Sequence, residues 1–105
     1  MIFNVSGGSS EYKIEMHENA SEIYISGETS VCDTNLSQII GLIIVDIGAY
    51  IIQFIGVNGK FITNSGSGGS SNQSGTYRIS NGKLVINGFS GYNLYKGTEI
   101  LLIGK

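Results

Sequence analysis

Few side chains in this sequence are of the types that carry out nucleophilic chemistry. There is one histidine, His17, and one cysteine, Cys32, the minimum for a pair in which an imidazole activates a thiol. Nothing around either residue marks an activated thiol, so we interpret Cys32 as a small buried hydrophobe and His17 as an exposed strand residue. A single cysteine also excludes an intrachain disulfide and zinc sites that need several cysteines.

Carboxylates are the next candidates, because a glycosidase uses a pair of them. On alternating strand positions next to a turn they are more typical of a solvated face, and the sequence has no tryptophan to line a sugar groove. The glutamates of the first third are Glu11, Glu15, Glu18, Glu22 and Glu28. Oxygen atoms of Glu18, Asn19, Glu22 and Asp33 could bind calcium, but no Asp-x-Asp-x-Asp-Gly loop is present. We expect no catalytic residue, no metal site and no cofactor.

The best ligand-binding candidate is a tyrosine-rich segment near the C-terminus. Tyr92, Asn93 and Tyr95 offer an amide and two rings that can lie against the apolar face of a sugar, with the Lys96 ammonium nearby. Residues three apart in a strand point to opposite faces, so a bulge or turn would be needed to bring both rings together. The alternative is that these tyrosines pack on the core or on a sheet face.

The low share of charged residues bears on possible partners. It is 13 % of 105 residues, against about a quarter in typical globular proteins, and such a surface favours assembly. The net charge of −2 combines an acidic first third with a more basic remainder. This predicts either two halves of one fold that face each other or complementary contacts between copies. A single arginine and no basic cluster predict no nucleic-acid partner.

The elements that must position these residues are signalled most strongly by three Asn-Gly dipeptides, at Asn58-Gly59, Asn81-Gly82 and Asn87-Gly88. Asn-Gly readily takes positive φ at both central positions of a type I′ turn. Between runs of alternating apolar and polar residues it therefore predicts antiparallel hairpins.

Strands are also expected before residue 27. Tyr12, Ile14 and Met16 alternate with polar residues, which predicts a half-buried strand with these three side chains inward. A turn over residues 18–21 would return the chain as a second strand over residues 22–26. A helix is the alternative, because apolar residues here also fall at helical spacing. Repulsion between glutamates four apart and the strand preference of Ile-Tyr-Ile favour the hairpin.

Residues 39–57 form the most apolar stretch of the sequence. It predicts two core strands, Leu42–Val45 and Tyr50–Val57, because buried strands read as continuous runs of β-branched residues. A membrane span is the alternative that we reject. Asp46, Gln53 and three glycines keep the apolar runs well below the length of about 18 residues that a span needs.

Two segments are expected to lie outside strands. Asp33 or Thr34 could cap a short helix over Asn35–Ile40. Residues 64–75 consist only of Asn, Ser, Gly and Gln, which predicts a flexible loop. Overall the pattern predicts one all-β domain over residues 1–105: an antiparallel β-sandwich or small barrel of about eight or nine short strands with at most one short helix.

Residues 1–8 are a candidate N-terminal arm. Ile2, Phe3 and Val5 form a short apolar segment before a Gly/Ser hinge, and such an arm can add a strand to a neighbouring sheet. We expect these three residues to contribute to oligomerisation. The segment lacks the basic region and apolar core of a secretory signal, so we expect no signal peptide.

The opening residues Met-Ile-Phe-Asn-Val-Ser-Gly-Gly, Met1 to Gly8, also resemble the start of small proteins encoded in tail modules of phages and prophages of Gram-positive bacteria. The resemblance implies a non-enzymatic virion structural protein of tail-fibre, baseplate or decoration type. It also implies a homo-oligomer, with a trimer favoured, that meets other virion proteins in the host cytoplasm. The alternative is a carbohydrate-binding module that recognises a host-surface glycan.

Overall fold

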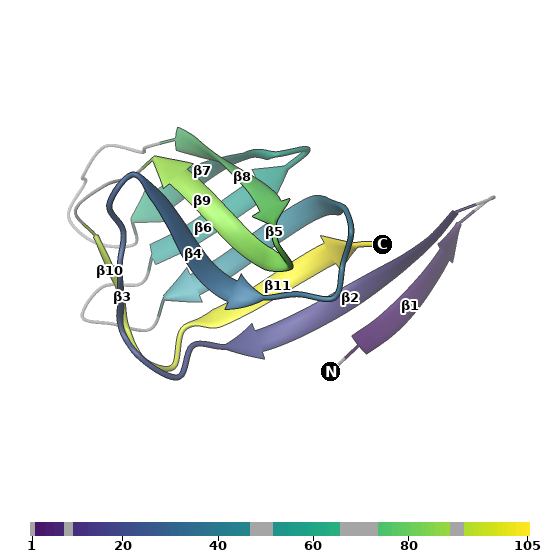
Figure 1. Ribbon diagram of the computed structural model, residues 1–105, viewed down its shortest axis with the longest axis horizontal. Helices are drawn as coiled ribbons and strands as arrows, with labels where there is room; N and C mark the ends of the chain where they lie inside the picture. The colour runs from purple at the N-terminus through teal and green to yellow at the C-terminus, as the bar shows by residue number, and fades with distance from the viewer. Residues whose placement is uncertain (1, 8–9, 47–51, 66–73, 89–91) are drawn as a thin grey trace.

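The computed structural model describes residues 2–7, 10–46, 52–65, 74–88 and 92–105, and within them it contains strands and no helix (Figure 1). The all-β prediction is therefore confirmed. One antiparallel sheet curls into a half-barrel, and a small two-stranded sheet lies at one end of it. Of the two architectures expected, the curled sheet is closer to the barrel than to the sandwich.

The order of strands in the large sheet is β1 (Ile2–Gly7), β2 (Ser10–Glu18), β11 (Glu99–Gly104), β5 (Ile39–Asp46), β6 (Ile52–Val57), β7 (Lys60–Ser65), β8 (Ser74–Ser80), β9 (Lys83–Gly88) and β4 (Glu28–Asp33). The small sheet pairs β3 (Ile23–Tyr24) with β10 (Asn93–Leu94). Every pairing is antiparallel, and β5 to β9 follow one another as hairpins in chain order.

Two of the three Asn-Gly dipeptides form the predicted hairpin turns. Asn58-Gly59 joins β6 to β7 with φ of 53° and 83°, and Asn81-Gly82 joins β8 to β9 with φ of 52° and 73°. Positive φ at both positions is the geometry of a type I′ turn. The third dipeptide, Asn87-Gly88, lies instead at the end of β9, where Gly88 pairs with Gly75.

Both predicted core strands are present, as β5 and β6, and the first is longer than expected. Residues 47–51 lie outside the described residues. The helix expected over Asn35–Ile40 is wrong, because this segment is a loop that enters β5 at Ile39. Its backbone amides bond to distant carbonyls rather than to a helical turn: Ser37 and Gln38 donate to the Lys105 carbonyl at 2.7 and 2.9 Å.

The strand predicted around residues 12–17 exists, but its inward face is the opposite of the one expected. Glu15 is 2 % exposed whereas Met16 is 44 % exposed. The reason is the pairing with β11, which puts Glu15 opposite the buried Leu102 and Met16 opposite Leu101. The predicted return strand also forms, as β3, yet it pairs with β10 and not with β2, so the hairpin is wrong.

The core lies inside the curl of the large sheet. Phe54 and Phe61 stack there with ring centroids 5.4 Å apart. Ile25 and Leu94, both fully buried, close the end of the half-barrel at the small β3–β10 sheet, which we call the lid.

Tyr77 is also buried, and its hydroxyl has no hydrogen-bond partner among the described residues. Burial raises the pKa of Tyr77 more than the nearby Gly59 backbone lowers it.

Close packing of the sheet requires glycine at one position of β8. A Cβ atom on Gly75 would lie 2.4 Å from the Asn87 carbonyl oxygen and 2.5 Å from the Phe61 ring. Gly41, on the outside of β5, is different, since a Cβ there would meet the flexible Ile103 side chain at 3.4 Å.

Candidate functional site

One face of the curled sheet carries a continuous row of apolar side chains that points away from the core. The register places one residue from each of five neighbouring strands directly opposite the next, and directly opposite residues share a face. These residues are Met16, Leu101, Ile43, Ile55 and Ile62, on β2, β11, β5, β6 and β7. With Ile14, Ile103 and Val57 beside the row, we call this set the outer apolar face.

The outer apolar face is open to solvent. Its five most exposed residues are between 38 % and 63 % exposed: Met16, Ile43, Ile55, Val57 and Ile62. Together they leave on the order of 400 Å² of apolar surface in water, which is in the range of the largest patch on a typical monomer. Toward β8 the face is hollowed, with an open volume of about 540 Å³ between Ile55, Val57, Ile62 and Thr76 that Lys60 also lines.

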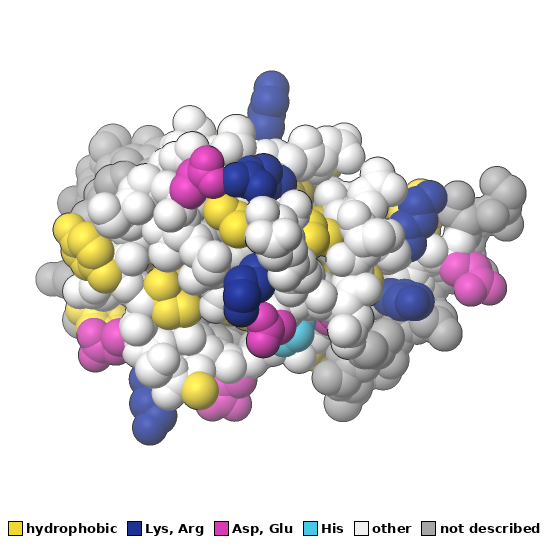
Figure 2. Space-filling view, viewed as in Figure 1, with side chains coloured by type: hydrophobic (Ala, Val, Ile, Leu, Met, Phe, Trp, Pro, Cys, Tyr) yellow, Lys and Arg dark blue, Asp and Glu magenta, His cyan; other side chains and the backbone are white. Residues whose placement is uncertain are grey.

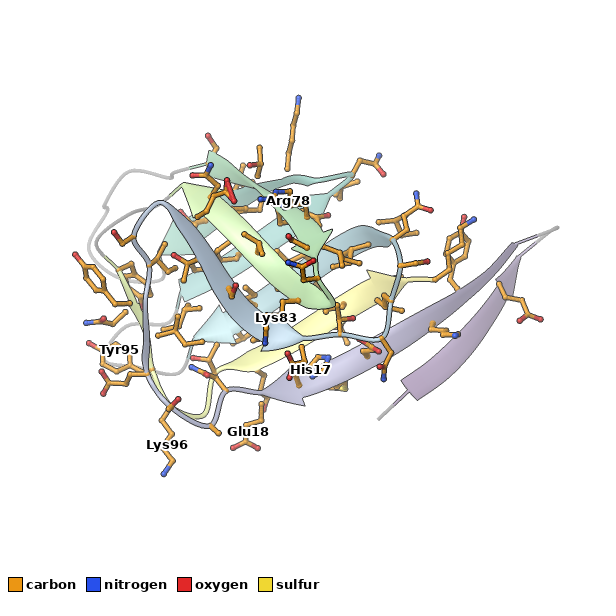
Figure 3. The ribbon with its side chains drawn as sticks, in the orientation of Figure 1. His17, Glu18, Arg78, Lys83, Tyr95 and Lys96 are labelled. Carbon is orange, nitrogen blue, oxygen red and sulfur yellow. The ribbon has the colours of Figure 1, made fainter. Side chains whose placement is uncertain are left out.

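Charged side chains flank the outer apolar face at two opposite corners. Glu18 on β2 and Glu99 on β11 are direct cross-strand neighbours at one corner, and Lys60 on β7 lies at the other, opposite Val57. All three are exposed, and among the described residues none of them has an ion-pair partner. Glu18 projects freely from the end of β2 in Figure 3.

Elsewhere opposite charges pair within the chain. Arg78 on β8 pairs with Glu28 on β4, and Lys83 on β9 lies 2.6 Å from Asp33 on β4. Figure 2 shows this side of the molecule, where blue and magenta side chains touch in two places over β4, β8 and β9. These two pairs join the acidic first third to the basic remainder, as expected for two halves of one fold that face each other.

A buried carboxylate lies where β2 approaches the end of β4. Glu15 accepts hydrogen bonds from the Thr34 hydroxyl and from the Asn35 amide, the latter at 3.1 Å, and His17 Nε2 lies 3.3 Å from Glu15 Oε1. Burial raises the pKa of Glu15, but these partners lower it by more, so the net shift is downward. No main-chain pairing joins β2 to β4 in the described residues, so this carboxylate bridges them. The expectation that Glu15 belongs to a solvated face is wrong.

His17 and Cys32 both lie in surroundings typical of residues that pack within the fold. The His17 side chain is only 29 % exposed, less than predicted, because it shares the inward phase of β2 with Glu15. Cys32 is half-buried and pairs with Leu84 of β9. Burial, with the Glu15 and Asp33 carboxylates nearby, raises the pKa of the Cys32 thiol to about 11. The thiol is therefore protonated at neutral pH, whereas a nucleophile must be a thiolate.

Two of the residues considered for calcium, Asn19 and Asp33, make hydrogen bonds within the protein. The Asn19 amide donates to the Leu94 and Tyr95 carbonyls, both at 3.3 Å, and so fixes the lid to the end of β2. Asp33 bonds to Lys83. In the part of the chain that the structure describes, no three His, Cys, Asp or Glu side chains gather as a metal site.

The lid separates the tyrosines of the predicted sugar site. Tyr92 turns toward the core, where its ring centroid lies 6.3 Å from that of Phe54, while Tyr95 is 37 % exposed. Tyr95 and Lys96 project from the end of the molecule in Figure 3. Asn93 pairs directly with Tyr24, which is 60 % exposed. Among the described residues, the exposed aromatic side chains at this end are thus Tyr24 on the lid and Tyr95 directly after it.

Tyr24 was not among the predicted site residues, although the sequence signals its position. It alternates with Ile23 and Ile25, which point inward, and so must point outward. The cross-strand partner could not be read from the sequence, because β3 and β10 are about seventy residues apart along the chain.

The N-terminal segment forms an edge strand of the large sheet. In β1 the backbones of Ile2, Phe3 and Val5 pair with Glu15, Ile14 and Tyr12 of β2. The first residues of β2 pair only with β1, so the two strands extend together beyond the rest of the sheet (Figure 1). The flexible loop predicted over residues 64–75 is wrong at its two ends, because residues 64 and 65 belong to β7 and residues 74 and 75 to β8, while residues 66–73 lie outside the described residues.

Comparisons with known proteins find no match: no family model, no curated protein and no solved structure is significantly similar to the chain. Among the described residues no helix is long and apolar enough to cross a membrane.

Proposed function

We propose that this chain is a non-enzymatic structural subunit of a phage or prophage particle, of tail-fibre, baseplate or decoration type. It acts by assembling with copies of itself and with other virion proteins. Assembly takes place in the host cytoplasm, and the subunit ends in the virion. The resemblance at Met1 to Gly8 supplies the phage context, and the outer apolar face supplies the physical support for assembly.

The outer apolar face is the observation that carries the proposal. Large exposed apolar patches on soluble proteins mark interaction sites, because water is released when a partner covers them. Here the patch is built from β-branched and long aliphatic side chains on consecutive strands of one sheet, a rigid platform for packing. The edge strand β1 adds a second route, since an unpaired strand edge can accept a strand from a neighbour.

Light scattering and sedimentation of the full chain test this proposal. We expect an oligomer whose mass stays constant from low to high micromolar concentration, and a trimer if the tail-module resemblance holds. Removing residues 1–8 is expected to weaken the oligomer if Ile2, Phe3 and Val5 take part. A monomer at the highest concentration would refute assembly as the function.

A second candidate function is recognition of a host-surface glycan by the lid. Tyr24, Asn93 and Tyr95 present two exposed rings and an amide at one end of the molecule. Binding on an array of bacterial surface glycans should fall when Tyr24 or Tyr95 becomes alanine and persist in Ile62→Ala, which lies on a different face. Absence of binding by the unmodified protein would dismiss this candidate.

A further inference from the structure

We propose that two copies of this chain dock through the outer apolar face about a two-fold axis, with Glu18 and Glu99 of each copy against Lys60 of the other. The inference rests on the proposed function and goes further, because it assigns the occupant of the face and the orientation of the two copies. Three features of the described residues support it: the make-up of the face, its unpaired charges and its hollow.

The make-up of the face is that of a protein–protein interface. Stable interfaces bury about 800 Å² on each partner, with an apolar centre and a polar rim. The five most exposed residues of the outer apolar face supply on the order of half of that area as apolar centre. Glu18, Glu99 and Lys60 supply charged groups at the rim.

The unpaired charges point to a second copy as the occupant. Glu18 and Glu99 lie directly opposite each other, an arrangement of like charges that is unfavourable unless a cation lies near both. Lys60 on β7, four strands from β2 at the opposite corner of the same face, is a cation without an ion-pair partner among the described residues, whereas the Lys105 ammonium lies 5.5 Å from the centroid of the Tyr12 ring. A two-fold axis in the plane of the interface exchanges the two corners, so each copy provides what the other lacks. This self-complementarity is what an isologous interface requires.

The hollow fits the same orientation. Met16 precedes Glu18 by two residues on β2 and lies on the same face, while Lys60 lines the hollow beside Val57 and Ile62. The rotation that brings Glu18 to Lys60 of the other copy therefore brings Met16 toward the hollow of that copy. Methionine is flexible and fills irregular apolar gaps well.

A two-fold contact joins copies in pairs. If a trimer forms through another surface, such as the β1 edge, the outer apolar face would then join two trimers. The inference therefore concerns one contact and does not depend on the stoichiometry of the whole particle.

Charge reversal tests the orientation. In Lys60→Glu, and in the double variant Glu18→Lys/Glu99→Lys, both rim contacts of a homodimer become repulsive, so the dissociation constant of the pair should rise about tenfold or more. When the two variants are mixed, both contacts become attractive again, and a heterodimer should form with close to the original affinity. Sedimentation of each variant and of the mixture measures this. Circular dichroism checks that the exposed substitutions leave the fold unchanged.

A variant at the centre of the face gives an independent readout. Ile55→Lys should disrupt the pair whatever happens at the charged rim, whereas Tyr24→Lys, at an exposed position on the lid, should leave the pair intact. An oligomer that survives both charge reversals and Ile55→Lys would overturn this inference and leave the proposed assembly function standing. Failure of the mixed variants to associate while each alone is disrupted would refute the two-fold orientation. A chain that is monomeric without any substitution would refute both.

Discussion

Replacing Glu15 by alanine is expected to destabilise the fold strongly. The substitution removes the acceptor of the Thr34 hydroxyl and of the Asn35 amide where β2 meets the end of β4. Thr34 is 8 % exposed, so water does not readily replace the lost partner. A buried donor left unpaired costs about 1–3 kcal/mol, and the Asn35 amide, whose bond to Glu15 is only partly buried, costs less than that, so we expect a loss of roughly 2–4 kcal/mol in the free energy of unfolding. Domains of this size are stable by only about 5–15 kcal/mol.

Two further variants show whether the loss comes from the acceptor. Glu15→Gln keeps one carbonyl oxygen that can still accept a bond, so it is expected to cost less, about 1–2 kcal/mol. Glu11→Ala removes an exposed glutamate from the same strand and should stay within about 0.5 kcal/mol of the unmodified protein. Urea unfolding followed by circular dichroism measures all three.

The pH dependence provides the second arm of this test. The pKa of Glu15 is lower in the fold than its ordinary value of 4.5, so the carboxylate binds protons less readily folded than unfolded. Its contribution to stability is complete above that ordinary value and is lost as the pH falls through the folded pKa. Asp33, whose pKa the Lys83 ammonium lowers, contributes a pH dependence of the same sign to the stability of every variant. Its contribution therefore cancels when the variants are compared. The reasoning is refuted if Glu15→Gln loses as much stability on acidification as the unmodified protein, or if Glu15→Ala unfolds like Glu11→Ala.

Three other features of the structure can be tested by substitution or by chemical reaction. Gly75→Ala should cost about 2–3 kcal/mol in unfolding free energy, because the new methyl group meets the rigid Asn87 carbonyl, while Gly41→Ala should change it little. Cys32, with a thiol pKa of about 11, should react slowly with a disulfide reagent at pH about 8 and rapidly once urea unfolds the chain. Tyr77→Phe removes a buried hydroxyl that has no hydrogen-bond partner among the described residues, so the melting temperature should stay the same or rise; a fall would indicate a hydrogen bond to that hydroxyl.

Local sequence signals predicted two of the hairpin turns correctly. The turns at Asn58-Gly59 and Asn81-Gly82 depend on two residues that tolerate positive φ, and this preference acts within the dipeptide itself. Asn87-Gly88 fails as a turn because β9 continues through it to pair with β8, so tertiary contacts there decide the backbone. The short helix over Asn35–Ile40 fails for a related reason, since a distant carbonyl, that of Lys105, takes the amides that a helix would use.

The orientation of β2 could not be predicted from its own residues. Alternation of apolar and polar side chains identifies a strand but assigns the inward face by assuming that apolar residues are buried. Here β11 fixes the orientation, because Ile100 and Leu102 are fully buried and the pairing forces His17 and Glu15 onto their side. The polar side chains of β2 can face inward because the Glu15 carboxylate there accepts hydrogen bonds from Thr34 and Asn35, just beyond the end of β4 and about twenty residues away in sequence.

The exposure of the outer apolar face, by contrast, could have been predicted from the sequence. The run over residues 39–57 is apolar in both strand phases, which is typical of strands buried on two sides. A strand is buried on both sides only if a second layer covers its outer face, and these 105 residues carry no long helix signal that predicts such a layer. Either the run is not a strand, or one of its phases faces solvent until another molecule covers it. The structure shows the second case at Ile43 and Ile55, and it is the same missing layer that the proposed pairing of two copies would supply.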